Sequence, residues 1–220
     1  MTPDFQKAAI KAAETIIQSD VIKTPISPFH ILKSFKNVQL IPFAEIANTI
    51  NMDRDKLIDT FGSESRAAVT SMKEENGKRF YLVAYSQYMP TVLVQRALAR
   101  ELGHIVLGHD GSRPVDVRMA EAYMFAHHLL TPRAIIKMLQ DSKYPFTINT
   151  LGNVTGCNKE CVERMRLLPG VNVPAELNRK IKERFSIGLK DFFSRYQDII
   201  QAHDTSEIVD VGTFMDGYEE

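Results

Sequence analysis

Apolar residues recur at intervals of three and four along most of the chain, which is the spacing of one face of a helix. A short β-prone run, Val38–Phe43, interrupts this pattern. The helical spacing predicts helices over residues 4–19, 27–35, 46–62, 90–108, 116–130 and 134–140, a helical pair over 146–168, and a long amphipathic helix beyond Pro169-Gly170. The pattern therefore predicts an α+β fold that is mostly helical.

A hairpin is the second predicted β feature. The runs Ala67–Met72 and Arg79–Tyr85 are β-prone, and Asn76-Gly77 between them supplies the positive φ values that a tight hairpin turn requires. With the earlier strand, the hairpin gives a small three-stranded sheet. Its edge could receive an extended peptide or could simply cover the helices, and the sequence favours neither interpretation.

The helix predicted over 90–108 carries the first candidate chemistry. Arg100 and His104 lie one turn apart, and Glu101 flanks them. Gly103 costs about 1 kcal/mol relative to alanine inside a helix, so something is expected to pack close to the backbone there. The stripe that should face the core consists of Val94, Leu98, Leu102 and Ile105.

The next helix supplies a second carboxylate. A polar break, Asp110–Pro114, separates the two helices, and Asp116 is expected to cap the second one. Glu121 projects beside a stripe of core residues made of Ala122, Phe125, Ala126 and Leu129.

The C-terminal part divides at Pro169-Gly170, which predicts one domain over 1–168 and an appended helix and tail over 169–220. The helical pair near Gly156 has a helix-turn-helix rhythm without a basic stripe. The long helix should cover the same domain, although its apolar stripe would also suit a homodimer. The tail from Ala202 onward is acidic and expected to be mobile.

Composition narrows the class of protein. The 27 basic and 27 acidic residues cancel, so no overall field attracts nucleic acid or anionic lipid. The apolar runs are too short to span a bilayer, and the first residues lack the features of a secretory signal, which predicts a cytoplasmic protein. Cys157 and Cys161 are expected to be free thiols.

Three short blocks now carry a resemblance. Residues 99–104 are A-R-E-L-G-H, residues 121–126 are E-A-Y-M-F-A, and residues 129–132 are L-L-T-P. This combination resembles the ImmA/IrrE metallopeptidases, which show A-H-E-L-G-H followed by E-A-x-x-F-A-x-x-L-L-x-P. The match covers about Ile26–Leu168 and leaves the N-terminal and the long C-terminal helices outside it.

The resemblance implies a zincin-like fold and a cytoplasmic zinc endopeptidase of a phage or mobile-element system, which cleaves a helix-turn-helix repressor. By position, Glu101 would activate the zinc-bound water, and His104 and Glu121 would be zinc ligands. Arg100 stands where the first histidine ligand of H-E-x-x-H belongs.

Arginine is a poor occupant of a ligand position. It stays protonated and has no lone pair to offer a metal. At ~4 Å and an effective dielectric constant of about 20, its charge and a divalent ion repel by roughly 8 kcal/mol. The sequence therefore suggests that Arg100 replaces the charge of the metal and bridges Glu101 and Glu121.

The other histidines do not supply an obvious replacement ligand. His109 follows His104 by five residues, on another face of the helix or beyond its end, although the loop could bring it nearer. His127 and His128 are expected to be surface or packing residues, and the position of His30 is open.

Three functions follow from these observations. The first is a catalytically impaired family member that still binds a repressor-like protein through the substrate groove. The second is an active zinc endopeptidase with a rebuilt metal site. The third is a DNA-associated regulator that uses the helical pair, although the balanced charge makes nucleic acid a weak candidate partner.

Overall fold

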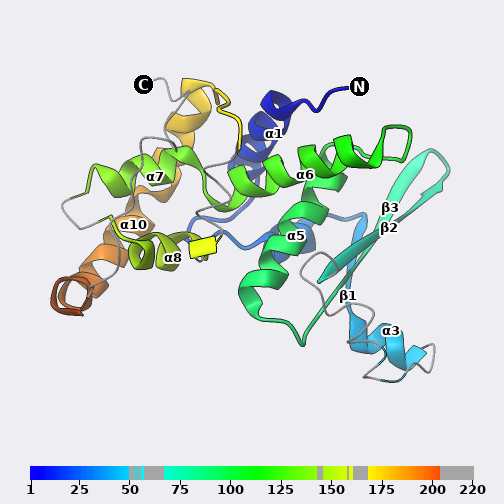
Figure 1. Cartoon of the computed structure of the whole chain (residues 1–220), viewed down its shortest axis with the longest axis horizontal. Coiled ribbons are helices and arrows are strands. Elements are labelled where there is room, and N and C mark those ends of the chain that lie inside the picture. Colours follow the sequence, from blue (N-terminus) through cyan, green and yellow to red (C-terminus); the bar gives the residue numbers. More distant parts are fainter. Residues whose placement is uncertain are drawn as a thin grey trace.

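The computed structural model describes residues 1–49, 53, 56, 67–142, 146–157, 159–160 and 168–203, with the side chains of the last helix described as far as residue 195. It shows a helix-rich α+β protein with one three-stranded mixed sheet (Figure 1). This confirms the predicted α+β class.

Helices α1 and α2 and strand β1 begin within one residue of their predicted positions, whereas α3 begins at Phe43, earlier than the predicted Ile46 and at the last residue of the predicted strand. Helix α1 spans Phe5–Gln18, and Asp4 caps it by accepting a hydrogen bond from the Lys7 N–H at 2.9 Å. Helix α2 spans Pro28–Ser34 behind its N-cap Ser27. Strand β1 (Val38–Pro42) and helix α3 (Phe43–Thr49) follow. The continuation of the predicted helix to residue 62 lies outside the described residues.

The sheet has the strand order β1-β3-β2, so β2 is an edge strand. Strands β2 (Ala68–Glu75) and β3 (Lys78–Tyr85) are antiparallel, and β1 pairs in parallel with β3. The turn between β2 and β3 has positive φ at both Asn76 and Gly77, as predicted. The hairpin lies beside α5 at one end of the molecule (Figure 1).

Helices α5 (Thr91–Val106) and α6 (Val115–Leu130) form the centre of the fold. They approach closely at Gly103, where an added Cβ would lie 3.0 Å from Phe125 Cδ1 and 3.2 Å from the Ala122 carbonyl oxygen. The expected close approach at Gly103 is therefore confirmed, and its partner is α6. The predicted core stripes of both helices are buried.

One predicted cap is wrong. Helix α6 begins at Val115 behind Pro114, and no side chain caps it. Asp116 lies inside the first helical turn instead, because a proline at residue 114 already starts the helix one position earlier. Its carboxylate there still complements the positive end of the helix dipole.

The C-terminal part of the chain contributes three described helices, of which α10 packs against the first helix. Helix α7 spans Arg133–Gln140, α8 spans Ile148–Thr155, and α10 spans Ala175–His203. Helix α10 contacts α1 and α7, and side chains of all three belong to one apolar core. The long helix therefore packs on the same domain, as predicted.

Much of the second half of the predicted helical pair over 146–168 lies outside the described residues. Helix α8 ends at Gly156, which has positive φ, but residues 161–167 lie outside the described residues, as do Cys161 and residues 204–220. Cys157 is buried. Within the described chain, no helix has the length and apolarity needed to span a bilayer.

Candidate functional site

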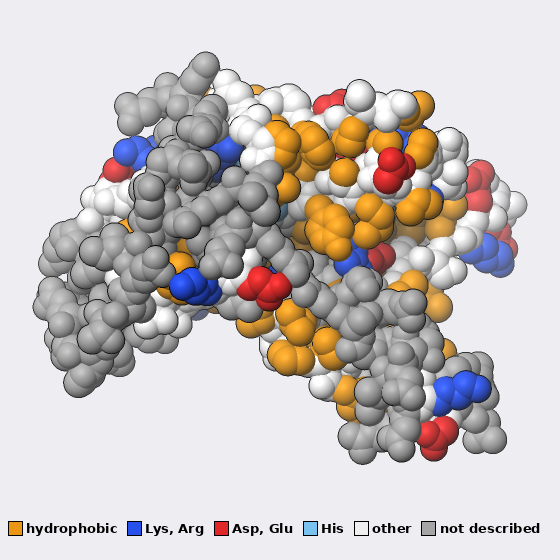
Figure 2. Space-filling view, viewed as in Figure 1, with side chains coloured by type: hydrophobic (Ala, Val, Ile, Leu, Met, Phe, Trp, Pro, Cys, Tyr) orange, Lys and Arg blue, Asp and Glu red, His pale blue; other side chains and the backbone are white. Residues whose placement is uncertain are grey.

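A cleft of about 410 Å³ lies between β2, α5 and the start of α6. Figure 2 shows hydrophobic side chains gathered along α6 and below it, with a few charged groups between them. Three of the four site residues predicted from the sequence, Arg100, Glu101 and His104, line the cleft, and Glu121 does not. Its other charged or hydrogen-bonding lining residues include Thr70, His109, Asp110 and Arg118.

Arg100 and Glu101 form a buried ion pair at the base of the cleft. The guanidinium Nη2 lies 3.1 Å from Glu101 Oε1, and it also donates to the Ala68 carbonyl at 3.5 Å. The ring of Tyr123 on α6 lies 5.7 Å from the guanidinium carbon. Burial raises the pKa of Glu101 although the Arg100 charge acts in the opposite direction.

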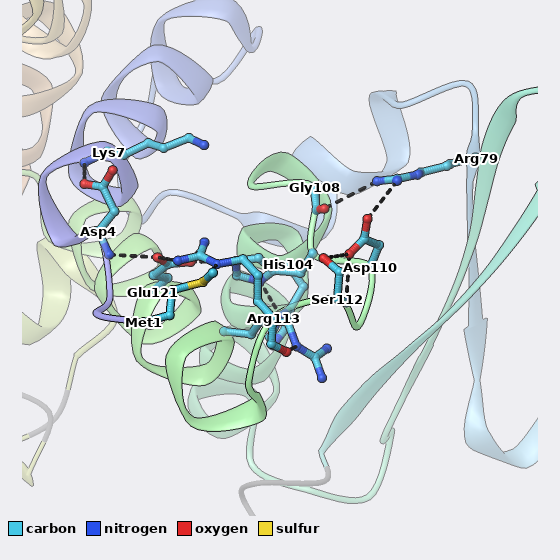
Figure 3. A network of polar contacts seen from close by, with 12 residues as sticks. Met1, Asp4, Lys7, Arg79, His104, Gly108, Asp110, Ser112, Arg113 and Glu121 are labelled. Carbon is cyan, nitrogen blue, oxygen red and sulfur yellow. Dashed lines mark hydrogen bonds and ion pairs between the residues drawn. The ribbon is translucent and has the colours of Figure 1, made fainter.

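Glu121 is held by a different arginine. Arg113 donates to both carboxylate oxygens, at 2.7 and 2.8 Å, and the backbone N–H of Asp4 donates to Oε1 at 2.7 Å (Figure 3). The sequence-based bridge through Arg100 is therefore corrected, because Arg100 pairs with Glu101 and the two-pronged partner of Glu121 comes from the loop after α5. Burial raises the pKa of Glu121, but these hydrogen bonds outweigh burial and leave the pKa below its usual value.

The end of α5 brings His109 back over His104. Gly108 has a φ of 70°, and its N–H donates to the Ile105 carbonyl at 3.1 Å. The His109 N–H donates to the His104 carbonyl at 3.0 Å, which completes a Schellman motif. In this motif the residue after the glycine lies against the residue five positions earlier. Here these two residues are His109 and His104.

The two imidazoles and Glu121 form a hydrogen-bonded chain. His104 Nδ1 and His109 Nδ1 are 2.8 Å apart, and His109 Nε2 is 3.0 Å from Glu121 Oε2. An ionised Glu121 only accepts, so His109 Nε2 carries the proton and donates. Nδ1 of a neutral His109 then accepts from His104 Nδ1, which leaves Nε2 of His104 without a proton.

The charge states of the two histidines agree with this chain. Burial, together with the positive charges nearby, lowers the pKa of His104 to about 4. Burial also lowers the pKa of His109, although Glu121 acts in the opposite direction. Both rings are therefore neutral at pH 7, and each shares one proton along the chain.

The arrangement does not fit a zinc ion in the position that H-E-x-x-H would give it. His104 and Glu121 contact different nitrogens of the His109 ring, so the three groups do not converge on one point. The described residues contain no group of three or more His, Cys, Asp or Glu side chains that is arranged to hold a metal ion. A metal bound by His104 and Glu121 would have to displace the ring of His109.

Comparison with known proteins adds no relative. No protein-family model, curated protein or solved structure matches the chain. The residues themselves therefore carry the functional argument.

The sequence left the place of His109 open, as a residue that the loop could bring nearer, and it missed Arg113. His109 had a recognisable signal, since a glycine at residue 108 after a predicted helix reverses the chain and returns the next residue to the helix end. Arg113 had none, because its contact with Glu121 depends on the path of the loop. His128 is buried as a packing residue, and His30 lies on α2 in contact with Asp20.

Proposed function

We propose that this protein is a zincin-like, catalytically impaired relative of the ImmA/IrrE metallopeptidases that binds a segment of a protein partner in the cleft beside β2. The observation that carries the proposal is the internal pairing of the residues that would serve catalysis. Glu101 is engaged by Arg100, and Glu121 is engaged by Arg113 and His109. Glu101 cannot activate a metal-bound water, and Glu121 cannot bind the metal, without breaking one of these pairs.

The edge strand supports the binding part of the proposal. Among the described residues, strand β2 pairs only with β3, and four of its residues line the cleft: Ala68, Val69, Thr70 and Met72. An extended peptide can add to such an edge through backbone hydrogen bonds while its side chains enter the cleft. Val69 and Met72 on this strand are 41% and 37% exposed, which offers apolar contacts for the peptide.

The resemblance suggests the class of partner. A repressor-like protein with a helix-turn-helix domain is the expected partner, and a regulatory system of a phage or mobile element is the expected setting. The bound segment would be held without being cut, so binding itself would transmit the signal.

Metal content tests the impaired site. We expect the natural protein, purified without added metal, to contain far less than one zinc per chain by mass spectrometry of the metal. Arg100→His alone should take up zinc weakly, because His109 still separates His104 from Glu121. Arg100→His combined with His109→Ala and Arg113→Gln, which also releases Glu121 from its bidentate arginine, should bind zinc stoichiometrically.

The controls use the same background. His109→Ala alone should remain free of zinc, since Arg100 keeps its charge in the site. One zinc per chain in the natural protein, lost in His104→Ala, would refute the proposal and favour an active zinc endopeptidase.

A further inference from the structure

Among the described residues that line the cleft, one cationic side chain takes no part in the ion pairs around it. The carboxylate of Glu101 lies 3.1 Å from Arg100, and the carboxylate of Asp110 lies 3.1 Å from Arg79 of the hairpin (Figure 3). Each acidic residue that lines the cleft therefore already has its own arginine. The remaining cation in the lining is Arg118 on α6.

Arg118 is anchored at one nitrogen only. Its Nε donates to the Arg113 carbonyl at 3.0 Å, which fixes the plane of the guanidinium. Within the described part of the chain, the two terminal nitrogens have no hydrogen bond or ion pair. A guanidinium held in this way presents two parallel N–H groups in the geometry that a carboxylate accepts.

The charge of Arg118 acts within the cleft. After burial and closer charges, Arg118 contributes to the lowered pKa of both His104 and His109. The other charged side chains that line the cleft are already paired, Glu101 with Arg100 and Asp110 with Arg79. The cleft thus offers a single net positive charge from a fixed direction.

The surroundings of Arg118 are apolar. Val69 and Met72 border the cleft from β2, and Val115 and Met119 border it from the same helix as Arg118. Val115 is 64% exposed, which is high for an aliphatic residue beside a cleft. A peptide that covers these side chains would exclude water from the guanidinium and strengthen a charged hydrogen bond to it.

We propose that Arg118 selects, among extended peptides that add to β2, those carrying an aspartate or glutamate side chain flanked by apolar residues. This inference rests on the proposed function and adds the chemical class of the bound segment. The apolar flanks would occupy the borders formed by Val69, Met72, Val115 and Met119, and the carboxylate would accept from both terminal nitrogens of Arg118.

Peptide selection tests the inference. A phage-displayed library of random dodecapeptides is selected against the natural protein, against Arg118→Gln and against Arg179→Gln. Arg179 is an exposed arginine of α10 and serves as the matched control. We expect one acidic position with apolar neighbours to be enriched with the natural protein and with Arg179→Gln, and to be lost with Arg118→Gln.

Affinity measurements give the size of the effect. An enriched peptide should bind about five- to tenfold more tightly than the same peptide with its acidic residue changed to the amide, measured by fluorescence anisotropy at low salt. Arg118→Gln should remove this difference while leaving the amide peptide's affinity unchanged. Urea unfolding of Arg118→Gln should remain a single cooperative transition, with its midpoint lowered only by the loss of the hydrogen bond to the Arg113 carbonyl, which shows that the fold is intact.

The outcomes separate the two proposals. If no peptide is enriched with the natural protein, peptide binding in the cleft is refuted and the inference falls with it. If peptides are enriched without an acidic position, or if Arg118→Gln keeps the acidic preference, the proposed function stands and the assignment to Arg118 is wrong.

Discussion

Two arginines each pair with one of the two carboxylates that the zincin pattern would place beside a metal, Glu101 as the base and Glu121 as a ligand. The Arg100 and Glu101 side chains are 5% and 9% exposed, so their pair is shielded from water on all sides. Arg113 is 29% exposed while Glu121 is 3% exposed. Removing either guanidinium leaves a buried carboxylate without its charge partner, which costs far more than losing a surface pair.

Arg100→Met tests this dependence. The variant leaves Glu101 buried and unpaired, so we expect the free energy of unfolding at pH 7.5 to fall by about 3 kcal/mol. Arg100→Met with Glu101→Gln should recover most of the loss, because no buried charge remains. Urea unfolding of the single and double variants measures the coupling.

The pH dependence and a control sharpen this test. Because burial raises the pKa of Glu101, its charge penalty is absent below about pH 4.5 and grows as the pH rises. The loss in Arg100→Met should therefore shrink toward acid pH. Arg179→Met on the surface should change stability by less than about 1 kcal/mol at any pH, and an equal loss in both variants would contradict the buried-pair account.

At the residue scale, the sequence predicted the contacts within one helix but not the contacts made by the loop. The spacing of Arg100, Glu101 and His104 on one helix follows from helical geometry, and the cleft confirms that these three residues meet. The partners of Glu121 depend on the loop between two helices. No periodic pattern specifies the path of a loop, so Arg113 could not be placed beforehand.

At the scale of elements, the contact between α5 and α6 sets the geometry of the site. The helices approach most closely at Gly103, one residue before His104 and opposite Phe125. This approach places Glu121 at the level of the α5 end, where the loop can return His109 between them. A wider separation would break the chain of hydrogen bonds from His104 to Glu121.

Gly103→Ala measures the tolerance of this contact. Alanine gains about 1 kcal/mol of helix propensity, but its Cβ would lie 3.0 Å from Phe125 Cδ1 and 3.2 Å from a backbone oxygen of α6. Since the backbone cannot yield without moving α6, we expect a net loss of about 1–3 kcal/mol in urea unfolding.

The chemistry of the site should report the same displacement. The side-chain NMR signals of His104 and His109 should shift in Gly103→Ala, because the distance between α5 and α6 changes. Ser194→Ala on the exposed face of α10 should change neither these signals nor stability by more than about 0.5 kcal/mol. A stabilised Gly103→Ala protein would show that the helices have room to spare.

The positions of the helices and of the hairpin turn were predicted better than the contacts between elements. Periodicity located α1, α5, α6 and α10, and the Asn76-Gly77 pair located the hairpin turn, because these features depend on local spacing and backbone freedom. The sequence did not specify that α10 would lie against α1 and α7. That choice depends on which apolar faces meet in three dimensions.

At the scale of the whole molecule, buried histidines make stability depend on pH. His128 is 4% exposed in the core where α6 ends, and the rings of His127 and His128 stack edge to face at 5.3 Å. Burial lowers the pKa of His127 to about 3 and lowers that of His128 well below its usual value. Both residues are therefore neutral in the folded protein across the range in which the unfolded chain takes up protons.

This difference predicts acid sensitivity. Below about pH 6.5 the unfolded chain binds protons that the folded protein refuses, so stability is fully present above that pH and is lost as the pH falls. His128→Leu removes one such proton, and we expect it to reduce the loss of stability between pH 7.0 and 5.5 by about 1 kcal/mol.

The comparison of the two proteins isolates His128, because the contributions of Glu101 and of the other histidines are the same in both and cancel. The carboxylates with lowered pKa values, such as Asp110 at about 2 and Glu121, influence stability at more acid pH than this window. Urea midpoints of the natural protein and His128→Leu, measured at both pH values, provide the comparison. An unchanged pH dependence in His128→Leu would mean that residue 128 already binds a proton in the folded protein.

The contact between Arg184 and the end of α1 has a consequence for how the chain is made. Arg184 donates to the carbonyls of Ile17, at 2.9 Å, and Val21, at 2.7 Å, which lie 167 and 163 residues earlier in the chain. During synthesis α1 can pack on α6 first, but its contact with α10 has to wait until the C-terminal helix is made. The step that closes the core is therefore a long-range one, and long-range closure is slow.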